Sequence, residues 1–346
     1  MKQSNQSVRI QAIAFVAIIV ALAWHGLRQR SVELDSGVRQ VMGTFTRILV
    51  VAPDKKTALS AIEAGMTAIT RVDTLMSDWD PNSQLSEVNR RAFLEPVMVD
   101  ADLFEVLSAA MDCSKLSDGA FDITIAPVVL LWRQTRQTGI APTDEQVAAA
   151  RAKVGYKNLL LDGQAKTVRF AVEGMALDLG GIAKGYAVDR AVTALKQAGA
   201  LGGMVSVGGE VYCFGTPAGK QPHWYIGLQD PADDDRILLK LKLDGRAVST
   251  SGDYQQFVII NGQKHSHIVN PATAQSAADL SSATIIAPTS MQADALATAV
   301  SVLGPEKGLA MIESVPDVEA LLIPSGQPNT FRKTPGVDPY IEDTLK

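Results

Sequence analysis

A glycine-rich stretch in the middle of the chain, DLGGIAKGYAVDRA (residues 178–191), combines residue types that can bind an anion. Gly180 and Gly181 would let the backbone approach a bulky group, and the helix that follows would direct unpaired N–H groups to the same place. Lys184 adds a positive charge in the first helical turn, where a cation is unfavourable for helix stability. The pattern is neither a P-loop nor a G-x-G-x-x-G fingerprint. It therefore indicates either an anion site or a tight structural turn.

A second stretch, APTSMQADALATAV (residues 287–300), carries two oxygen-bearing side chains one helical turn apart. Thr289 or Ser290 can cap the helix, and Asp294 and Thr298 then share one face. Such a pair could supply oxygen ligands to a hard cation such as Mg²⁺. The alternative is a surface carboxylate that suits the helix dipole, followed by a threonine at the edge of the core.

The stretch KHSHIVNPATA (residues 264–274) contains two of the four histidines of the chain. His265 and His267 would point to the same side if the segment is a strand. Because no further ligand follows at a suitable spacing, the pair does not favour a zinc site. His267 could serve as a general base or a phosphate contact, and the alternative is an ordinary strand histidine.

Two shorter features could bind a flat ring. Trp79 lies in the polar segment MSDWDPNSQLSEVN (residues 76–89), where an indole either covers the core or offers a stacking platform. Ala120, Phe121 and Asp122 follow a glycine and could add a second ring contact and a hydrogen-bond acceptor.

The periodicity of the sequence predicts elements that would position these residues. The strands arrive in hairpin-spaced groups and do not alternate strictly with helices, so the pattern indicates an α+β fold with antiparallel sheets. We expect strands at 41–52, 237–243 and 254–260, two or three short strands within 158–179, and helices opening at Asp54 and at 101–116, 143–153, 182–199, 291–303 and 305–313.

The N-terminus differs in composition from the rest of the 346-residue chain. Lys2 and Arg9 precede an apolar run, Ile10–Trp24, and Ala21–Ala23 offers a small-x-small cleavage site. We therefore expect residues 1–24 to be a signal peptide or an uncleaved membrane anchor, residues 25–40 a linker, and the remainder an exported domain. The net charge of −5 and the absence of basic clusters argue against a nucleic-acid partner. The two cysteines form no disulfide framework, and we expect two separate buried thiols.

The ordered set of motifs MGT, MSDWDPNSQLSEVN, DGAFDI, DLGGIAKGYAVDRA, SVGGE, HIVNPATA and APTSMQADALATAV resembles the ApbE family of FAD:protein FMN transferases. The likeness spans about residues 41 to 304 and implies an ApbE-like domain over 41–340. It implies a T-fold-like α+β architecture with FAD in a cleft between lobes. It also implies an enzyme that splits the pyrophosphate of FAD, places FMN on a Ser or Thr hydroxyl of a target protein, and releases AMP.

The resemblance also implies site residues. Gly181, through its carbonyl, together with Asp294 and Thr298 would hold Mg²⁺, and we expect Lys184 and His267 to take part in catalysis. The residues that would contact FAD are Met42, Trp79, Ala120, Phe121, Asp122, Asp178, Lys184 and Ile268.

The targets that the resemblance implies are exported proteins with a Ser/Thr motif, such as redox-pump subunits, and the expected location is the periplasm. No cysteine precedes Cys113, so the lipoprotein anchor of many relatives is not expected. Asn270 stands where Asp is frequent in the family, Ala274 where Gly is usual, and Trp79 where Tyr is common. An FAD pyrophosphatase and a flavin-binding module without catalysis are the alternative functions.

Overall fold

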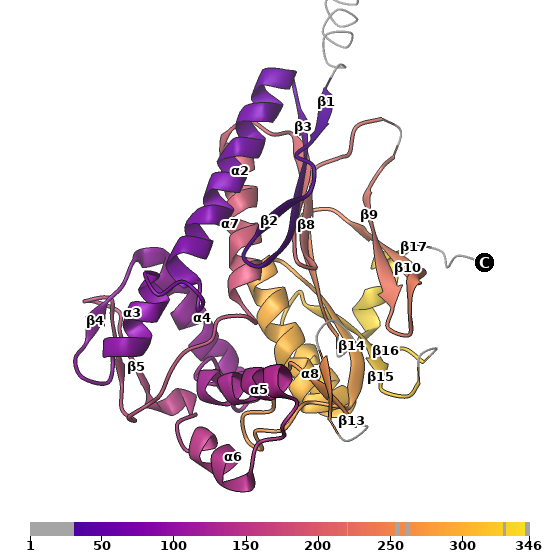
Figure 1. Cartoon of the computed structure of the whole chain (residues 1–346). Helices are drawn as coiled ribbons and strands as arrows, with labels where there is room; N and C mark the ends of the chain where they lie inside the picture. Colours follow the sequence, from indigo (N-terminus) through magenta and orange to yellow (C-terminus); the bar gives the residue numbers. More distant parts are fainter. Residues whose placement is uncertain (1–30, 220, 253–256, 261–262, 328–329, 343–346) are drawn as a thin grey trace, which may run out of the picture.

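The structure is a computed structural model that describes residues 31–219, 221–252, 257–260, 263–327 and 330–342 (Figure 1). The predicted signal or anchor segment, residues 1–24, lies outside the described residues. The signal-or-anchor assignment therefore stays a prediction.

A nine-stranded antiparallel sheet forms the centre of the described fold. Its strands are β1 (Val32–Asp35), β2 (Arg39–Val41), β3 (Thr44–Ala52), β7 (Gly202–Val207), β8 (Glu210–Phe214), β11 (Arg246–Gly252), β14 (Leu280–Ala287), β15 (Glu319–Pro324) and β16 (Arg332–Lys333). Their order across the sheet is β1-β3-β7-β8-β11-β14-β15-β16, and β2 forms a hairpin with β3. The expected α+β class with antiparallel sheets is confirmed.

The first strands correct one expected boundary. We expected residues 25–40 to be a linker, but Val32 pairs with Ala52 and the whole of β1 lies along β3. β2 pairs with β3 through Arg39 and Thr46, across a two-residue turn at Met42 and Gly43. Backbone hydrogen bonding thus draws residues 32–41 into the sheet, and the folded domain begins before residue 41.

Two layers cover the central sheet (Figure 1). The helices α2 (Lys55–Met76), α7 (Ala183–Gln197) and α8 (Ser290–Glu313) pack on one face. The strands β9 (Trp224–Asp230), β10 (Asp233–Leu243) and β17 (Ile341–Glu342) form a small sheet on the other face. Strand β3 shows why both faces are covered, since Ile48 and Val50 join the core under the helices while Val51 joins the core under the small sheet.

Helix α8 is a core helix of this fold. Among the described residues it is the one helix long and apolar enough to pass a membrane-span test, yet more than half of its most apolar stretch is buried inside the protein. Gly304 adopts a φ of 76° and Pro305 follows it, which kinks the element. The two helices predicted at 291–303 and 305–313 therefore join end to end across this kink.

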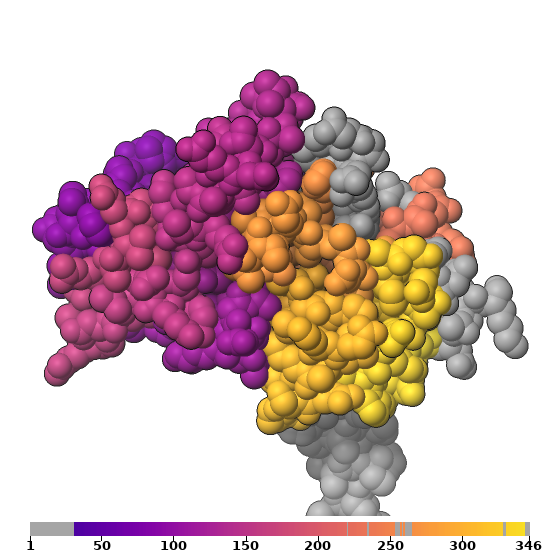
Figure 2. Space-filling view, turned by 90° about the horizontal axis from the view of Figure 1, so that it is seen from below, coloured from indigo at the N-terminus to yellow at the C-terminus, as the bar shows by residue number. Residues whose placement is uncertain are grey.

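Between α2 and α7 the chain builds a second unit, which we call the small lobe (residues 84–170). It contains the helices α3 (Gln84–Arg91), α4 (Ala101–Leu116), α5 (Ala126–Thr138) and α6 (Asp144–Arg151) and a sheet of β4 (Val97–Met98), β6 (Thr167–Phe170) and β5 (Leu159–Asp162). Seen from below, its magenta surface meets the orange surface of the segment that leads into α8 (Figure 2). That segment includes the hairpin of β12 (Phe257–Ile260) and β13 (Gln263–Ser266).

The two cysteines are free and buried, as expected. Burial in apolar surroundings raises the pKa of the Cys113 thiol to about 12, and it also raises that of Cys213. We therefore predict that the native protein gives no reaction with a thiol reagent such as DTNB at pH 8, and that two thiols react once the protein is unfolded. Rapid reaction of even one thiol in the native protein would contradict this burial.

Candidate functional site

The site begins where the first turn of α7 crosses the first turns of α8. Gly185 lies at the crossing, and a Cβ on Gly185 would come within 2.2 Å of the carbonyl oxygen of Ser290 and 2.8 Å of the Cα of Met291. Only glycine permits this approach of two helix backbones. The crossing brings the Asp294 carboxylate to the Gly185 amide, which donates a hydrogen bond to it over 3.0 Å.

The crossing itself can be tested. We predict that Gly185→Ala lowers the free energy of unfolding by about 1–3 kcal/mol, because the added methyl meets backbone atoms that no rotamer change can move. Urea denaturation measures this change. Gly163→Ala, where the added methyl meets nothing within 4 Å, is the matched control. Equal stability of the two variants would show that the helices do not approach so closely.

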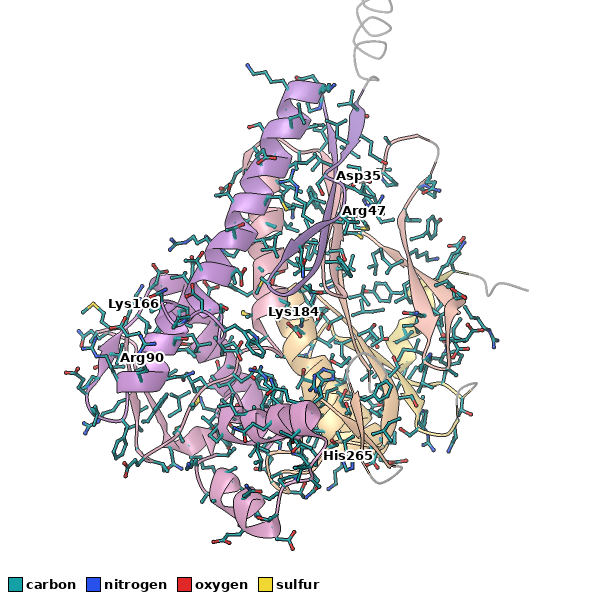
Figure 3. The ribbon with its side chains drawn as sticks, viewed as in Figure 1. Asp35, Arg47, Arg90, Lys166, Lys184 and His265 are labelled. Carbon is teal, nitrogen blue, oxygen red and sulfur yellow. The ribbon has the colours of Figure 1, made fainter. Side chains whose placement is uncertain are left out.

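Lys184 is the centre of a charged cluster at this crossing (Figure 3). Its Nζ lies 2.9 Å from Glu210 Oε1 and 3.4 Å from each carboxylate oxygen of Asp294. The ammonium also donates a hydrogen bond to the Gly180 carbonyl, 3.1 Å away. The side chains of Glu210 and Asp294 are almost fully buried, whereas that of Lys184 is 25% exposed. Lys184 is therefore the member of this cluster whose side chain is the most exposed.

The electrostatics of the cluster follow from burial and pairing. Burial raises the pKa of Glu210 to about 7, with the neighbouring Asp294 adding to the shift and Lys184 opposing it. Burial also raises the pKa of Asp294, again against the pull of Lys184. Burial alone would lower the pKa of Lys184, but the two carboxylates outweigh it and hold that pKa above its usual value. The lysine is charged at neutral pH.

The glycine turn lies against α8 one helical turn beyond Asp294. A Cβ on Gly181 would be 2.8 Å from the Thr298 hydroxyl oxygen and 3.4 Å from the ring of Phe121. Helix α7 begins directly after this turn, and its N-cap residue Ile182 has no side chain that can cap the helix. The site thus combines the start of a helix, a lysine, and the predicted pair Asp294 and Thr298.

The donor set fits a magnesium ion in its chemistry. Asp294, Thr298 and the carbonyl of Gly181 offer one carboxylate, one hydroxyl and one amide oxygen, and Mg²⁺ prefers oxygen ligands and keeps several waters. Glu210 contributes a buried carboxylate oxygen, Oε2, without a hydrogen bond of normal length. Within the described residues, no group of three or more His, Cys, Asp or Glu side chains that could hold a metal ion is found.

A cavity of about 340 Å³ opens on the small lobe and extends to Asp178, just before the glycine turn. Trp79 stands at its rim with 72% of its surface exposed, so it does not cover the core. The guanidinium of Arg133 lies 4.4 Å from the centre of the Trp79 ring. The cavity is lined by Asp78, Trp79, Pro81, Ser86, Asn89, Arg90, Ala126, Leu130, Arg133, Ala176, Leu177 and Asp178.

Asp178 joins this cavity to the charged cluster. Its Oδ1 accepts a hydrogen bond from the Gly180 amide over 2.8 Å, and its Oδ2 pairs with Arg133 over 3.2 Å. Burial and the nearby Asp78 raise the pKa of Asp178. The carboxylate therefore fixes the start of the glycine turn and one wall of the cavity together.

The remaining residues of the expected FAD set have different surroundings. Phe121 is buried against the glycine turn, but both carboxylate oxygens of Asp122 are used locally, by Thr124 and by the Tyr156 amide. Ala120 is half-buried in the turn before them, and Ile268 is buried. The Asp122 carboxylate thus holds the loop in shape.

Met42 occupies the tight turn between β2 and β3. It has a φ of 54° and is followed by Gly43 at 67°, which is the turn geometry that suits a two-residue hairpin. The Met42 amide donates a hydrogen bond to Asp73 near the end of α2, over 3.2 Å. This contact fixes the turn to the helix that leads to Trp79.

The expectation that His265 and His267 share one side of a strand is wrong. Strand β13 ends at Ser266, so His265 lies on the strand and His267 in the bend that follows it. His265 stacks on Trp132 of α5 with 5.1 Å between the ring centres. The Trp132 indole N–H also donates a hydrogen bond to the Ala274 carbonyl over 2.9 Å. Helix α5 therefore supports the loop that carries His267 and Ile268.

Sequence reasoning missed three residues that the fold brings to this region. Glu210 is the closest partner of Lys184, Arg133 lies against Trp79, and Asp189 accepts hydrogen bonds from Ser290 and Met291 at the start of α8. Glu210 belongs to the SVGGE motif and Asp189 to the glycine-rich stretch. Their acidic side chains within these two motifs were the signal in the sequence that could have identified them as site residues. Arg133 had no such indication, because its role depends on contacts with distant segments.

With this geometry established, the chain can be compared with known proteins. The family model described as "ApbE family" matches residues 42–322. The chain belongs to the ApbE family. An FAD:protein FMN transferase from Treponema pallidum is 31% identical over 338 residues, which cover 93% of this chain and 92% of that protein. The FAD:protein FMN transferase from Haemophilus influenzae is 32% identical over 88% of this chain and 90% of its own length.

Solved structures agree with this assignment. The ApbE protein from Thermotoga maritima superimposes with a TM-score of 0.81 at 30% identity, covering 91% of this chain and all of that one. The flavin transferase ApbE from Vibrio cholerae has a TM-score of 0.80 at 28% identity, with 90% of this chain and all of that one covered. The expected ApbE architecture is confirmed.

Proposed function

We propose that this protein is an FAD:protein FMN transferase. The observation that carries the proposal is the place of Lys184, whose ammonium lies between the carbonyl of the glycine turn and the carboxylates of Glu210 and Asp294. A polyanion at the start of α7 would meet a fixed positive charge and the positive end of the helix dipole. This is the environment that a pyrophosphate needs.

The reaction balances without any oxidant or other reactant. A hydroxyl oxygen of the target protein forms a bond to the FMN phosphorus, the bond from that phosphorus to the bridging oxygen breaks, and AMP leaves with the bridging oxygen. The hydroxyl proton passes to a base. Phosphoryl transfer of this kind depends mainly on neutralised charge and on groups held in line.

The residues of the site divide this work. Lys184 would neutralise phosphate charge, and the positive end of the α7 dipole would add to that neutralisation. Gly181, Asp294 and Thr298 would hold Mg²⁺, which supplies further charge neutralisation at the pyrophosphate. Glu210 keeps the Lys184 ammonium charged and in place.

The ring systems of FAD would bind on the small-lobe side. Trp79 offers an exposed indole face at the rim of the cavity, and Asp178 lies at the cavity end nearest the glycine turn. The other residues proposed to contact FAD are Met42, Ala120, Phe121, Asp122, Lys184 and Ile268.

His267 is the proposed base for the incoming hydroxyl. It lies in a half-buried bend directly after β13. We predict that His267→Ala slows FMN transfer by about 10²-fold, because a positioned base commonly contributes at least that much. Transfer is measured as flavin fluorescence of the target in a denaturing gel, over a range of pH. Full transfer with an unchanged pH profile would remove His267 from the mechanism.

One assay separates the candidate functions. The purified protein is incubated with FAD, Mg²⁺ and a candidate target, and the products are analysed by chromatography and in a denaturing gel. Transferase activity gives AMP and a fluorescent target band. An FAD pyrophosphatase gives AMP and free FMN, because water replaces the hydroxyl, and a flavin-binding module gives neither product.

The targets and the location follow from the N-terminal sequence and the chemistry. We propose exported proteins with a Ser or Thr acceptor motif, such as redox-pump subunits, as the targets, and the periplasm as the location. Association with the inner membrane would depend on residues 10–24. Cell fractionation with and without that segment tests the location, since loss of the segment should leave the protein in the cytoplasm.

A further inference from the structure

Arg133 makes three contacts, with two segments of the chain that are far apart in sequence. From α5, its guanidinium pairs with Asp78 over 2.6 Å and with Asp178 over 3.2 Å, and it covers one face of the Trp79 ring at 4.4 Å. The arginine side chain is 23% exposed, and its two carboxylate partners are exposed to 25% and 14%. The guanidinium is thus partly desolvated, which strengthens its ion pairs and its contact with the ring.

The Trp79 indole is exposed, and hydrogen bonds hold the backbone of the loop that carries it. The Ser83 and Ser86 hydroxyls donate hydrogen bonds to the carbonyls of Ser77 and Asp80, and Arg90 donates one to the Pro81 carbonyl over 2.7 Å. These bonds fix the loop but do not touch the indole. Among the described residues, Arg133 is the cation that stacks on the Trp79 ring.

Helix α5 is itself held in place. Ala126 and Leu130 form part of the cavity wall, and Trp132, next to Arg133, is buried and bonded to the Ala274 carbonyl. Arg133 therefore extends from a fixed helix. Its two carboxylate partners come from the Trp79 loop and from the segment two residues before Gly180.

We propose that Arg133 is a positioning residue, which holds the Trp79 indole and Asp178 in the relative placement that lets FAD stack on the indole while its phosphates lie at the glycine turn. This inference rests on the proposed function. The guanidinium fixes the indole before the ligand arrives, so that less conformational freedom is lost on binding. Arg133 acts on FAD affinity through Trp79 and Asp178 and takes no part in the chemical step.

A double-mutant cycle on FAD binding tests this inference. We expect Arg133→Met to raise the Kd for FAD, measured by titration calorimetry, by about tenfold, the scale of one cation–ring contact with its ordering effect. Trp79→Leu should weaken binding at least as much. The double variant Arg133→Met with Trp79→Leu should lose less affinity than the sum of the two single losses, because Arg133 then has no indole to hold.

Two further readouts separate positioning from a general structural role. For AMP release, Arg133→Met should raise KM with little change in kcat. Arg133→Lys should recover only part of the affinity, since an ammonium lacks the planar face that stacks on the indole. Gln134→Met, an exposed neighbour on the same helix, is the control and should bind FAD like the native protein. If Arg133→Met does not fold, Asp78→Asn removes the guanidinium's partner and should shift the Kd in the same direction.

The outcomes test the positioning role of Arg133 separately from the proposed transferase function. Additive losses in the cycle, or unchanged affinity in Arg133→Met, would overturn the positioning role while leaving the transferase proposal intact. Tight FAD binding with a coupled cycle but no FMN transfer would support the positioning role and contradict the transferase. A native protein that does not bind FAD at all would overturn both.

Discussion

Replacing Asp294 by asparagine is expected to slow AMP release from FAD by about 10³-fold, the upper range for loss of one preorganised electrostatic group. The carboxylate is buried, faces Lys184, and accepts the Gly185 amide. It is also the proposed anionic ligand for Mg²⁺, and an amide oxygen is a weaker ligand for that ion. AMP release is measured by chromatography at saturating FAD over a series of Mg²⁺ concentrations.

The change should leave the fold largely intact. Asparagine has nearly the same shape as aspartate and can still accept the Gly185 hydrogen bond, while Lys184 keeps Glu210 as a partner. Ser301→Ala is a suitable control, because its hydroxyl bonds only to the Ala297 carbonyl of its own helix. Ser301→Ala should release AMP at the native rate. An Asp294→Asn variant with native rate and native Mg²⁺ dependence would remove Asp294 from the site.

Replacing Lys184 by methionine is expected to damage both stability and activity. Glu210 and Asp294 would be left buried near each other without a cation, and breaking a buried pair by removing one partner costs about 3–5 kcal/mol. Without the ammonium, transfer should also fall by about 10²–10³-fold. Urea denaturation gives the stability, and flavin fluorescence of the target gives the transfer rate.

A compensating variant separates the two effects. Adding Glu210→Gln to Lys184→Met removes one of the two unpaired charges, and this double variant should regain much of the lost stability. It should not regain transfer, because the positive charge at the glycine turn is still missing. Recovery of transfer along with stability would mean that Lys184 serves the fold alone.

The same cluster shows how far the sequence could be interpreted. The glycine turn, Lys184 and the pair Asp294 and Thr298 were predicted as separate motifs, and each left a structural alternative open. For Asp294 that alternative was a surface carboxylate, and it is wrong because the side chain is almost fully buried. The fold brings Gly181 to Thr298 and Lys184 to Asp294, although these partners lie more than a hundred residues apart along the chain.

The sequence could not show where side chains meet across segments. The Asp122 carboxylate is used by its own loop, and His265 stacks on Trp132, because each position depends on neighbours from other elements. Residues 32–35 alternate apolar and acidic side chains, but four residues are a short signal, and pairing with β3 makes them a strand.

The amino-acid sequence by itself determined the class of fold, the position of most helices and the motifs that identify the ApbE family. These features depend on residue type and on the periodicity of neighbouring residues, which the sequence shows directly. Tertiary structure alone decided that Glu210 neutralises Lys184, that Arg133 covers Trp79, and that Gly185 brings two helices into contact. The physical reason is that hydrogen bonds, ion pairs and close packing act over a few ångströms in space, whatever the distance along the chain.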